Sequence, residues 1–480
     1  MADKVISELD RVLQVVGTED IPVALDGANG RLSPWQIDFY TSRNIQGRPL
    51  KIAFAGDSIA ELFGQLKTGG PFFWSQARKP RGLIFHNADT SAGVVAVSGS
   101  KSGTLKGAGG STVYTAVDGT DMNTPAMIAK LTAWAPDVLI IESGTNDSSY
   151  SPDDSSTFQN VRAVIEAVGA RHTIIIPILP RNGWTTADFS RSYNSFIRAY
   201  AAATPGVHVL GVEHLFADSA LGVKGGAGGT AGDPTIDGLH PSLTYGKAME
   251  PMLSDLLDTL GVPAIQPRAI TGGDVYSSTR PGLNILGVAG AMSGTFAGDF
   301  VTAPCAGVVP EYSWQLGAAD NNDEMIATAS KSSFDFEGNT VDSIKLVISG
   351  SGAMTANRRV HMNMSTTLPA GTQIDGVAQA LVRISNPSGL LCVSLTVAGY
   401  IGGAYKTVQM GGNFSFTAAD LLPGDLDEVW QYMMPGPLPF DPETSITFSF
   451  DIWGLSGETA GGTIEVAQVG YHQLALPAAA

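Results

Sequence analysis

Between residues 51 and 260 the sequence alternates short apolar runs with longer amphipathic stretches. The short runs are typical of strands buried on both faces of a sheet, and the longer stretches repeat apolar residues at helical spacing. A strand, a helix and a second strand in succession form the repeating unit of a parallel sheet. The predicted strands are residues 51–56, 137–142, 173–178 and 207–210, and the predicted helices are about 59–67, 123–135, 157–169, 187–203 and 244–260.

Beyond about residue 265 the helical spacing is replaced by two-residue alternation of apolar and polar positions. Clusters of Gly, Pro, Asn and Asp separate the alternating runs, which is typical of antiparallel strands joined by tight turns. The pattern predicts an all-β sandwich with a jelly-roll-like arrangement. The clearest runs are residues 343–349, 377–384, 392–397, 445–450 and 463–469.

Residues 1–50 differ from both regions. Val5, Leu9, Leu13 and Val16 fall near one face of a predicted short helix, and a stretch punctuated by glycine and proline follows it. This pattern is typical of an attachment arm more than of a domain. The sequence therefore predicts three parts, which are an N-terminal arm at 1–50, an α/β domain at 51–264 and a β-sandwich at 265–480.

Composition and charge narrow the functional classes. The chain has 480 residues, a formal net charge of −17 and only 15% charged residues. An acidic chain without a basic cluster offers no electrostatic attraction to nucleic acid or to an anionic membrane surface. No apolar stretch approaches the ~18 residues of a membrane-spanning helix, and the first residues lack the basic and apolar blocks of a signal peptide. We expect no nucleic-acid partner, no membrane insertion and no export by the general secretory route.

A candidate nucleophile follows the first predicted strand. That strand ends in Gly56-Asp57-Ser58, and a helical stretch begins at Ile59. In an open parallel sheet, ligands bind at the carboxyl ends of the strands, so Ser58 is expected at the site with its amide at a helix N-terminus. Taken alone, the tripeptide fits a helix-capping serine equally well.

Two further segments place polar residues at equivalent positions. Asn146 follows the strand 137–142, where its amide could donate to a developing oxyanion. Asp237 and His240 lie three residues apart on one turn before the last helix of the domain. This spacing lets the carboxylate reach the imidazole and fix its tautomer.

Together these segments resemble the SGNH hydrolases, also called GDSL-type esterases and lipases. Gly56-Asp57-Ser58 resembles the nucleophile block, Gly144-Thr145-Asn146-Asp147 the Asn block, and Asp237-Gly238-Leu239-His240-Pro241 the acid and base block, in the order of the family. The resemblance covers roughly residues 50–260. It implies a three-layer α/β/α, flavodoxin-like hydrolase domain.

The family's remaining block supplies a glycine whose amide contributes to the oxyanion hole. Gly110, within the segment 107–112, is the better match, although Leu105 stands where the family usually has Asn. Gly99 is a second candidate, and the choice between the two glycines stays open.

The resemblance also implies a mechanism. His240, oriented by Asp237, would take the proton of Ser58, whose Oγ attacks an ester carbonyl. The amides of Ser58 and Gly110 and the side chain of Asn146 would hold the oxyanion. No metal or organic cofactor is expected.

Other conspicuous residues are predicted to be structural. Met354, Met362 and Met364 are expected in the core, Cys305 and Cys392 as free thiols, and the run 320–324 as a solvated turn in preference to a calcium site. Most aromatics of the β region are expected in the core, although some could stack on sugar rings. These aromatics are Tyr400, Tyr405, Trp430, Tyr432 and Trp453.

The substrate class is narrowed by the rest of the chain. The α/β domain lacks a long apolar lid segment, which disfavours a lipase that works at oil interfaces, and a large β-sandwich often serves to bind polysaccharide. We therefore expect a serine esterase that removes O-acetyl groups from a bacterial surface polysaccharide.

A composition rich in Gly, with few charges and without an export signal, is typical of virion proteins. The arrangement of arm, esterase and β-rich domain resembles a bacteriophage tail spike or tail fibre, which implies a homotrimer acting at the bacterial surface and tail proteins that bind the arm. Two alternatives stay open: an extracellular bacterial carbohydrate esterase not carried on a virion, and a receptor-binding tail module with vestigial activity.

Overall fold

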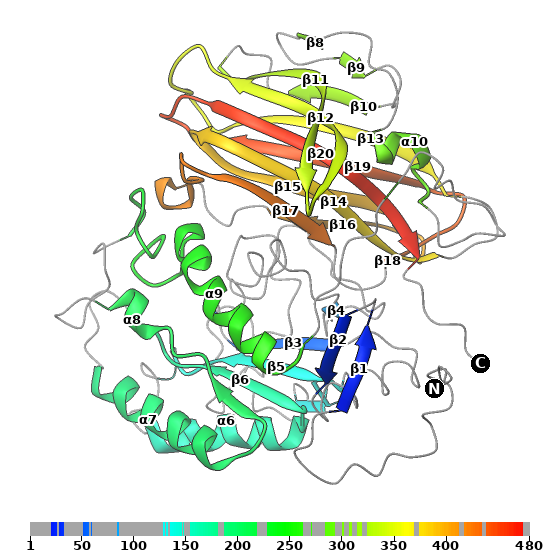
Figure 1. Cartoon of the computed structure of the whole chain (residues 1–480). Coiled ribbons are helices and arrows are strands. Elements are labelled where there is room, and N and C mark those ends of the chain that lie inside the picture. The colour runs from blue at the N-terminus through cyan, green and yellow to red at the C-terminus, as the bar shows by residue number, and fades with distance from the viewer. Residues whose placement is uncertain are drawn as a thin grey trace, which may run out of the picture.

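The computed structural model of the chain consists of an α/β domain and a β-sandwich that lies beside it (Figure 1). The described residues are 21–25, 28–32, 51–56, 59, 84–85, 128–129, 131–132, 135–145, 147, 154–180, 187–217, 228–262, 270, 284–292, 300–301, 307–309, 314–318, 324–368, 374–411, 417–433 and 438–473.

The α/β domain is built on a five-stranded sheet in which every described pair of neighbouring strands is parallel. The strand order β4-β3-β5-β6-β7 is the flavodoxin-like order, and the predicted fold class is confirmed. Four observed strands agree with the predicted runs to within two residues, and these are β3 (Lys51–Gly56), β5 (Val138–Glu142), β6 (His172–Ile176) and β7 (Val207–Val209). The short strand β4 (Ile84–Phe85) was not predicted.

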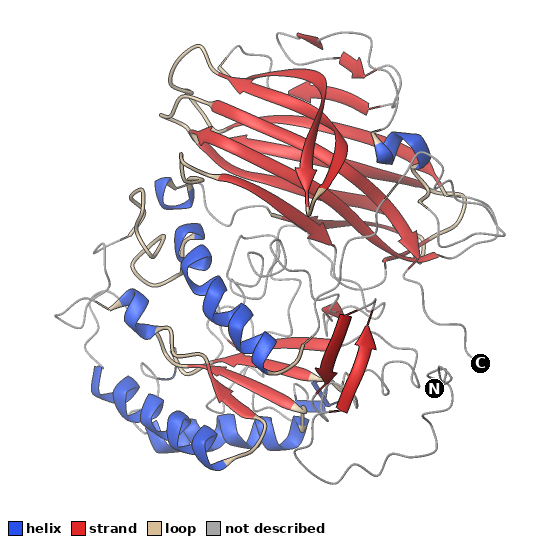
Figure 2. Ribbon diagram, viewed as in Figure 1, coloured by secondary structure: helices blue, strands red, loops and turns tan. Residues whose placement is uncertain are grey.

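Helices cover both faces of this sheet (Figure 2). The strands are apolar on both faces, so each strand supplies alternate residues to two separate cores. The helices α6 (Asp154–Val168) and α7 (Ala187–Ala203) pack on the face that presents Leu139 and Ile141. The longer α9 (Leu243–Thr259) packs on the opposite face, with Val138 and Ile140. The short α8 (Glu213–Phe216) follows β7.

The C-terminal region is a sandwich of two sheets in which all described strand pairs are antiparallel, as predicted. The six-stranded sheet has the order β16-β15-β19-β13-β10-β9, and the seven-stranded sheet has the order β17-β14-β20-β12-β11-β8, with β18 paired to β14. The strands are β8 (Phe300–Val301), β9 (Gly307–Val309), β10 (Trp314–Ala318), β11 (Ile326–Phe336), β12 (Asn339–Ser349), β13 (Arg358–Thr367), β14 (Ile374–Ser388), β15 (Leu390–Ile401), β16 (Ala404–Met410), β17 (Asp427–Met433), β18 (Leu438–Phe440), β19 (Ser445–Gly454) and β20 (Gly461–Gln473).

Alternate residues of these strands point into the sandwich. In β19, Phe448, Phe450 and Ile452 are fully buried, while the residues between them lie on the outer face. The predicted core role of Met354, Met362 and Met364 is confirmed, because all three are buried. Cys392 is a buried free thiol, as predicted, and Cys305 lies outside the described residues.

The described part of the N-terminal region is a hairpin of β1 (Ile21–Leu25) and β2 (Ala28–Leu32). The sequence pattern did not predict this hairpin, and the helix predicted from Val5 to Val16 lies outside the described residues. The predicted boundary between 264 and 265 also lies outside them. Among the described helices, none is long and apolar enough to cross a membrane.

The two domains are in contact along α9. The short helix η3 (Ala418–Asp420) and the strand β17 of the sandwich lie beside the first turns of α9 (Figure 1). One apolar cluster runs from the sheet through α9 into the sandwich and includes Ile140, Leu253 and Trp430. The α/β domain and the sandwich therefore share part of their core.

Candidate active site

The segment that carries Asp237 and His240 is a tight loop held by its own backbone. Thr235 and Pro241 form a β-bridge, and the amide of Ile236 donates to the carbonyl of His240 at 2.9 Å. The Thr235 hydroxyl accepts the amide of Gly238 at 3.0 Å. Hydrogen bonds between residues close in sequence thus fix the loop that carries Asp237 and His240.

The side chains of Asp237 and His240 are in direct contact. Oδ2 of Asp237 lies 2.6 Å from Nδ1 of His240, while Oδ1 accepts the amide of His240 at 2.7 Å and that of Leu239 at 3.0 Å. Since an ionised carboxylate can only accept, Nδ1 carries the proton and Nε2 of the neutral ring keeps its lone pair. His240 is therefore in the tautomer that a general base requires.

The electrostatics of the pair favour an ionised carboxylate. Burial by itself would raise the pKa of Asp237, but hydrogen bonds from the ring and amide of His240, together with the amide of Leu239, outweigh it and lower the pKa to about 2. The His240 side chain is 21% exposed, so its ring can meet a ligand from solvent.

The start of α9 places this loop beside the carboxyl end of the sheet. Ser242 caps α9, and its hydroxyl accepts the amide of Tyr245 at 3.3 Å. The hydroxyl of Tyr245 donates to the carbonyl of Val212 at 3.1 Å, just beyond the end of β7. Ile59 is buried in the same apolar cluster as Tyr245. The residue that follows the candidate nucleophile thus belongs to the same core as the helix that follows His240.

The loop after β5 is also tightly packed. Gly144 has a φ of +109°, and a Cβ at this position would lie 3.0 Å from Cδ1 of Ile178 and 3.1 Å from Cζ of Tyr193. The hydroxyl of Thr145 donates to the buried carboxylate of Glu142 at 3.1 Å, and Asp147 is fully buried. The described residues on both sides of the candidate Asn146 are therefore fixed by packing.

The structure brings together two of the predicted site residues, Asp237 and His240, and the contact predicted between them is present. The nucleophile Ser58, the oxyanion candidates Asn146 and Gly110 and the alternative Gly99 lie outside the described residues. Ser58 follows β3 by two positions, and Gly56 and Glu142, the last residues of β3 and β5, are in register. The assignments of these residues stay predictions.

The aromatic residues of the sandwich divide into two groups. Trp430 and Tyr432 are buried as predicted, whereas Tyr400 and Tyr405 are among the exposed large side chains, so fewer of the five aromatics lie in the core than predicted. The ring of Trp453 is partly buried, with the Arg359 guanidinium 5.4 Å from its centre.

The predicted solvated turn is described only at its last residue. The Glu324 carboxylate accepts Nε of Arg358 at 2.7 Å, and the other residues of the run 320–324 lie outside the described part of the chain. No group of three His, Cys, Asp or Glu side chains among the described residues could hold a metal ion.

The sequence analysis missed one residue that contacts the segment after His240, which is Asp420 of the sandwich. Oδ1 of Asp420, in the sandwich, accepts the amide of Leu243 at 3.1 Å, three residues after His240. The two residues are 177 positions apart, so no local pattern links them.

A parallel sheet with an Asp–His loop beside its carboxyl end is an arrangement that serine hydrolases use. Residues 54–244 match the model of the family described as GDSL-like Lipase/Acylhydrolase. This match covers the α/β domain, which is therefore similar to that family of hydrolases.

Comparisons of the whole chain give only distant similarity. A search of curated proteins gave no match. Among solved structures, the chain is similar to a two-domain esterase active on acetylated mannans, with 13% identity, 92% of this chain and 95% of the other covered, and a TM-score of 0.28. The chain is also similar to a family 3 carbohydrate esterase from Clostridium thermocellum. The identity is 17%, the alignment covers 45% of this chain and 98% of the other, and the TM-score is 0.30. A third similar structure comes from a study of carbohydrate-binding modules of the β-sandwich superfamily. The identity is 8%, the alignment covers 33% of this chain and 57% of the other, and the TM-score is 0.23.

Proposed function

We propose that this protein is a serine esterase that removes acyl groups, most simply acetyl, from a polysaccharide. The observation that carries the proposal is the 2.6 Å contact between Asp237 and His240 on a loop of the domain that matches the acylhydrolase family. This contact leaves Nε2 of His240 able to accept a proton, which is the requirement for activating a serine hydroxyl.

The proposed reaction has two halves. Nε2 of His240 takes the proton from Ser58 Oγ as Oγ bonds to the ester carbonyl carbon, and the tetrahedral intermediate collapses by expelling the sugar oxygen, which takes the proton from His240. Water then attacks the acyl-enzyme with His240 as base, and the products are the carboxylic acid and free Ser58. The amides of Ser58 and Gly110 and the Asn146 side chain hold the oxyanion, each donor contributing about 3–4 kcal/mol to transition-state stabilisation.

The polysaccharide part of the proposal rests on the outer face of the six-stranded sheet. Tyr400 and Tyr405 are cross-strand partners next to a two-glycine turn, are 42% and 59% exposed, and have ring centres 5.4 Å apart. Asp441 accepts the amides of both turn glycines, at 2.8 and 2.7 Å, which fixes the hairpin that carries the rings. Exposed rings on a rigid hairpin suit stacking on the apolar face of a sugar.

Much of the rest of that outer face carries hydroxyl and amide groups, beside an ion pair of Arg359 and Asp451 at 3.6 Å. The alternating register of β13, β15, β16 and β19 places them on the side opposite the buried phenylalanines of β19. Neutral hydrogen-bonding groups of this kind suit a ligand rich in hydroxyl groups. They include Asn363, Ser365, Thr396, Thr407, Gln409, Thr447 and Ser449.

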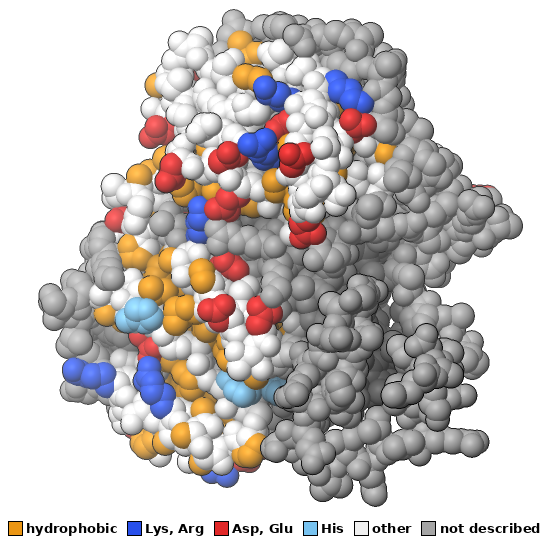
Figure 3. Space-filling view, viewed as in Figure 1, with side chains coloured by type: hydrophobic (Ala, Val, Ile, Leu, Met, Phe, Trp, Pro, Cys, Tyr) orange, Lys and Arg blue, Asp and Glu red, His pale blue; other side chains and the backbone are white. Residues whose placement is uncertain are grey.

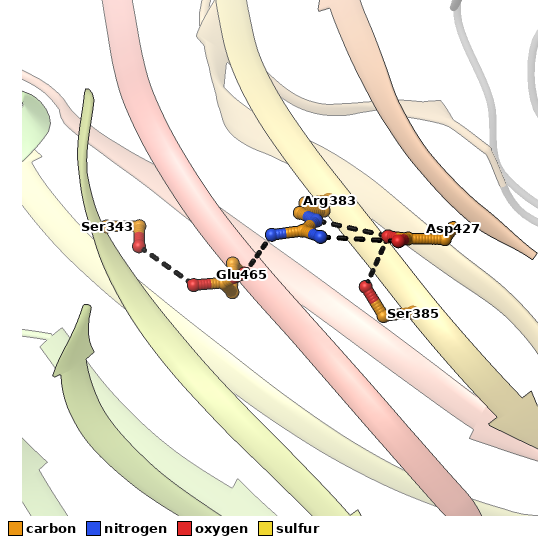
Figure 4. Close-up of polar contacts among 5 residues, drawn as sticks. All are labelled: Ser343, Arg383, Ser385, Asp427 and Glu465. Atoms are coloured by element: carbon orange, nitrogen blue, oxygen red, sulfur yellow. Dashed lines mark hydrogen bonds and ion pairs between the residues drawn. The ribbon is translucent and has the colours of Figure 1, made fainter. Parts of the chain in front are cut away.

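The opposite face of the sandwich has a different chemistry. Arg383 lies between Asp427, at 3.1 Å, and Glu465, at 3.5 Å, while Ser385 and Ser343 donate to the two carboxylates (Figure 4). Basic and acidic side chains are mixed on the visible surface of the sandwich (Figure 3). The charges of this network pair with one another across neighbouring strands, and exposed aromatic rings lie on the six-stranded sheet, which is therefore the better candidate for a sugar ligand.

The test is the release of acetate from acetylated polysaccharides and from a chromogenic acetate ester. We expect the wild-type protein to release acetate from both, and Ser58→Ala to release it from neither while its unfolding temperature is unchanged. Turnover by Ser58→Ala equal to that of the wild type would contradict the mechanism. Release from the small ester alone would contradict the polysaccharide substrate.

The biological setting is a separate proposal. A carbohydrate esterase that is not carried on a virion accounts for the hydrolase domain and the sandwich without further components, so we prefer it to the phage tail setting and to a vestigial receptor-binding module. The tail setting predicts a homotrimer, which sedimentation at several protein concentrations would detect. Acetate release at a rate that Ser58→Ala abolishes would argue against the vestigial module.

A further inference from the structure

A carboxylate of the sandwich caps the helix that follows the Asp–His loop. Asp420 lies in η3, is only 3% exposed, and accepts the amide of Leu243 at 3.1 Å. Leu243 is the first residue of α9 and stands three positions after His240. The contact therefore joins the sandwich to the point where the candidate catalytic loop becomes a helix.

The first amides of a helix have no acceptor within the helix, and a negative charge near them is stabilising. At α9, two of these amides have acceptors from different domains. The Ser242 hydroxyl accepts a hydrogen bond from the amide of Tyr245, and the Asp420 carboxylate accepts one from the amide of Leu243. The Asp420 carboxylate of the sandwich thus helps to fix the position of Leu243.

The two ends of the loop are held together within the α/β domain. The amide of Ser242 donates to the carbonyl of Pro234 at 3.0 Å, and its hydroxyl donates to the carbonyl of Asp233 at 2.6 Å. These contacts close the base of the loop. The contact of Asp420 then fixes the direction in which the chain leaves His240 and enters α9.

We infer that Asp420 is a positioning residue for His240, so that the sandwich forms part of the catalytic scaffold in addition to any role in binding polymer. The inference rests on the proposed esterase function. It predicts that loss of the Asp420 carboxylate displaces the imidazole from its reacting geometry. Displacements of about 1 Å can cost as much as 10²-fold in rate.

A second contact between the same two domains provides a matched control for the contact of Asp420. Glu428, in β17, pairs with Lys247 of α9 at 3.3 Å, one turn further from the loop, and both side chains are more than a quarter exposed. Partly exposed ion pairs contribute about 0–1 kcal/mol. Glu428→Gln therefore weakens the contact between the domains without touching the helix N-terminus.

The experiment is steady-state kinetics of the full chain with a chromogenic acetate ester, which is too small to engage the sandwich. We expect Asp420→Ala to lower kcat by about 10-fold to 10²-fold with KM within twofold. Asp420→Asn keeps a carbonyl oxygen as acceptor and is expected to restore at least half of the wild-type kcat. Glu428→Gln is expected to keep the wild-type kcat.

Wild-type kcat in folded Asp420→Ala, or equal losses in Asp420→Ala and Glu428→Gln, would overturn the inference. If Asp420→Ala does not fold, Asp420→Glu is measured, because it keeps the charge but moves the carboxylate by one methylene group. A lower kcat in Asp420→Glu supports positioning, and the wild-type kcat contradicts it. Absence of any Ser58-dependent turnover in the wild type would instead contradict the proposed function.

Discussion

Replacing Asp237 by asparagine is the sharpest test of the Asp–His contact, because the two oxygens of this carboxylate have different partners. Oδ1 accepts the amides of Leu239 and His240, and Oδ2 accepts Nδ1 of His240. An asparagine must keep its carbonyl oxygen at the two backbone amides, since its NH₂ group cannot accept from them. The NH₂ group then faces Nδ1 of His240.

This reversal changes the tautomer of the imidazole. A donor facing Nδ1 holds the proton of the neutral ring on Nε2, which can no longer accept the proton of a serine. In triads of this kind, loss of the carboxylate lowers kcat by about 10⁴-fold, which corresponds to about 5 kcal/mol of transition-state stabilisation. The loop itself should persist, because both backbone hydrogen bonds remain.

The assay is kcat with a chromogenic acetate ester, together with the unfolding temperature of each variant. Asp233→Asn is the matched control, since Oδ2 of Asp233 accepts the amide of Thr230, at 2.8 Å, on the neighbouring turn. We expect wild-type kcat in Asp233→Asn. A kcat within tenfold of the wild type in folded Asp237→Asn would refute the assignment of His240 as the base oriented by Asp237.

Three further predictions follow from the geometry. Because the pKa of Asp237 falls from 3.8 to about 2 on folding, its ionised form stabilises the native state above pH 4, and this contribution is lost as the pH falls through 2. Since its side chain is 48% exposed, we discount the shift to about 1 kcal/mol, measurable as the difference in acid unfolding between wild type and Asp237→Asn. The double substitution Tyr400→Ala and Tyr405→Ala should raise KM for an acetylated polysaccharide several-fold and leave kinetics with the small ester unchanged; equal effects on both substrates would exclude a role in polymer binding. Gly144→Ala should destabilise the fold by about 2 kcal/mol or more in chemical denaturation, because φ is +109° and Tyr193 leaves no room for Cβ, whereas Gly352→Ala, which meets nothing within 4 Å, is the control.

The elements that sequence patterns predicted well are those whose signal is local. Both α7 and α9 were predicted to within one residue, because their apolar positions repeat at helical spacing over many residues. The strand β5 was found because a short apolar run precedes polar residues. The hairpin of β1 and β2 was missed, since two five-residue strands in a stretch without clear alternation give little periodic signal.

The candidate site also contains some features that local sequence patterns predict and others that depend on packing between distant segments. The contact between Asp237 and His240 follows from a three-residue spacing, so sequence alone could predict it. The capping of α9 by Asp420 depends on how two domains pack, and its partners are 177 residues apart. Similarly, alternation indicated that β15 has two faces, but which aromatics face solvent depended on how the strands pair and pack.

The contact between the domains bears on how the sandwich acts. A binding module that is joined only by a linker raises the local concentration of substrate, and its removal changes KM for the polymer alone. Here one apolar cluster runs through α9 into the sandwich, and a buried carboxylate of the sandwich accepts the first amide of α9. The sandwich therefore has two separable contributions, one through Tyr400 and Tyr405 that acts on polymer binding and one through Asp420 that acts on turnover of any ester. Because they reside on different elements, their effects on KM for the polymer and on kcat for a small ester should add without coupling.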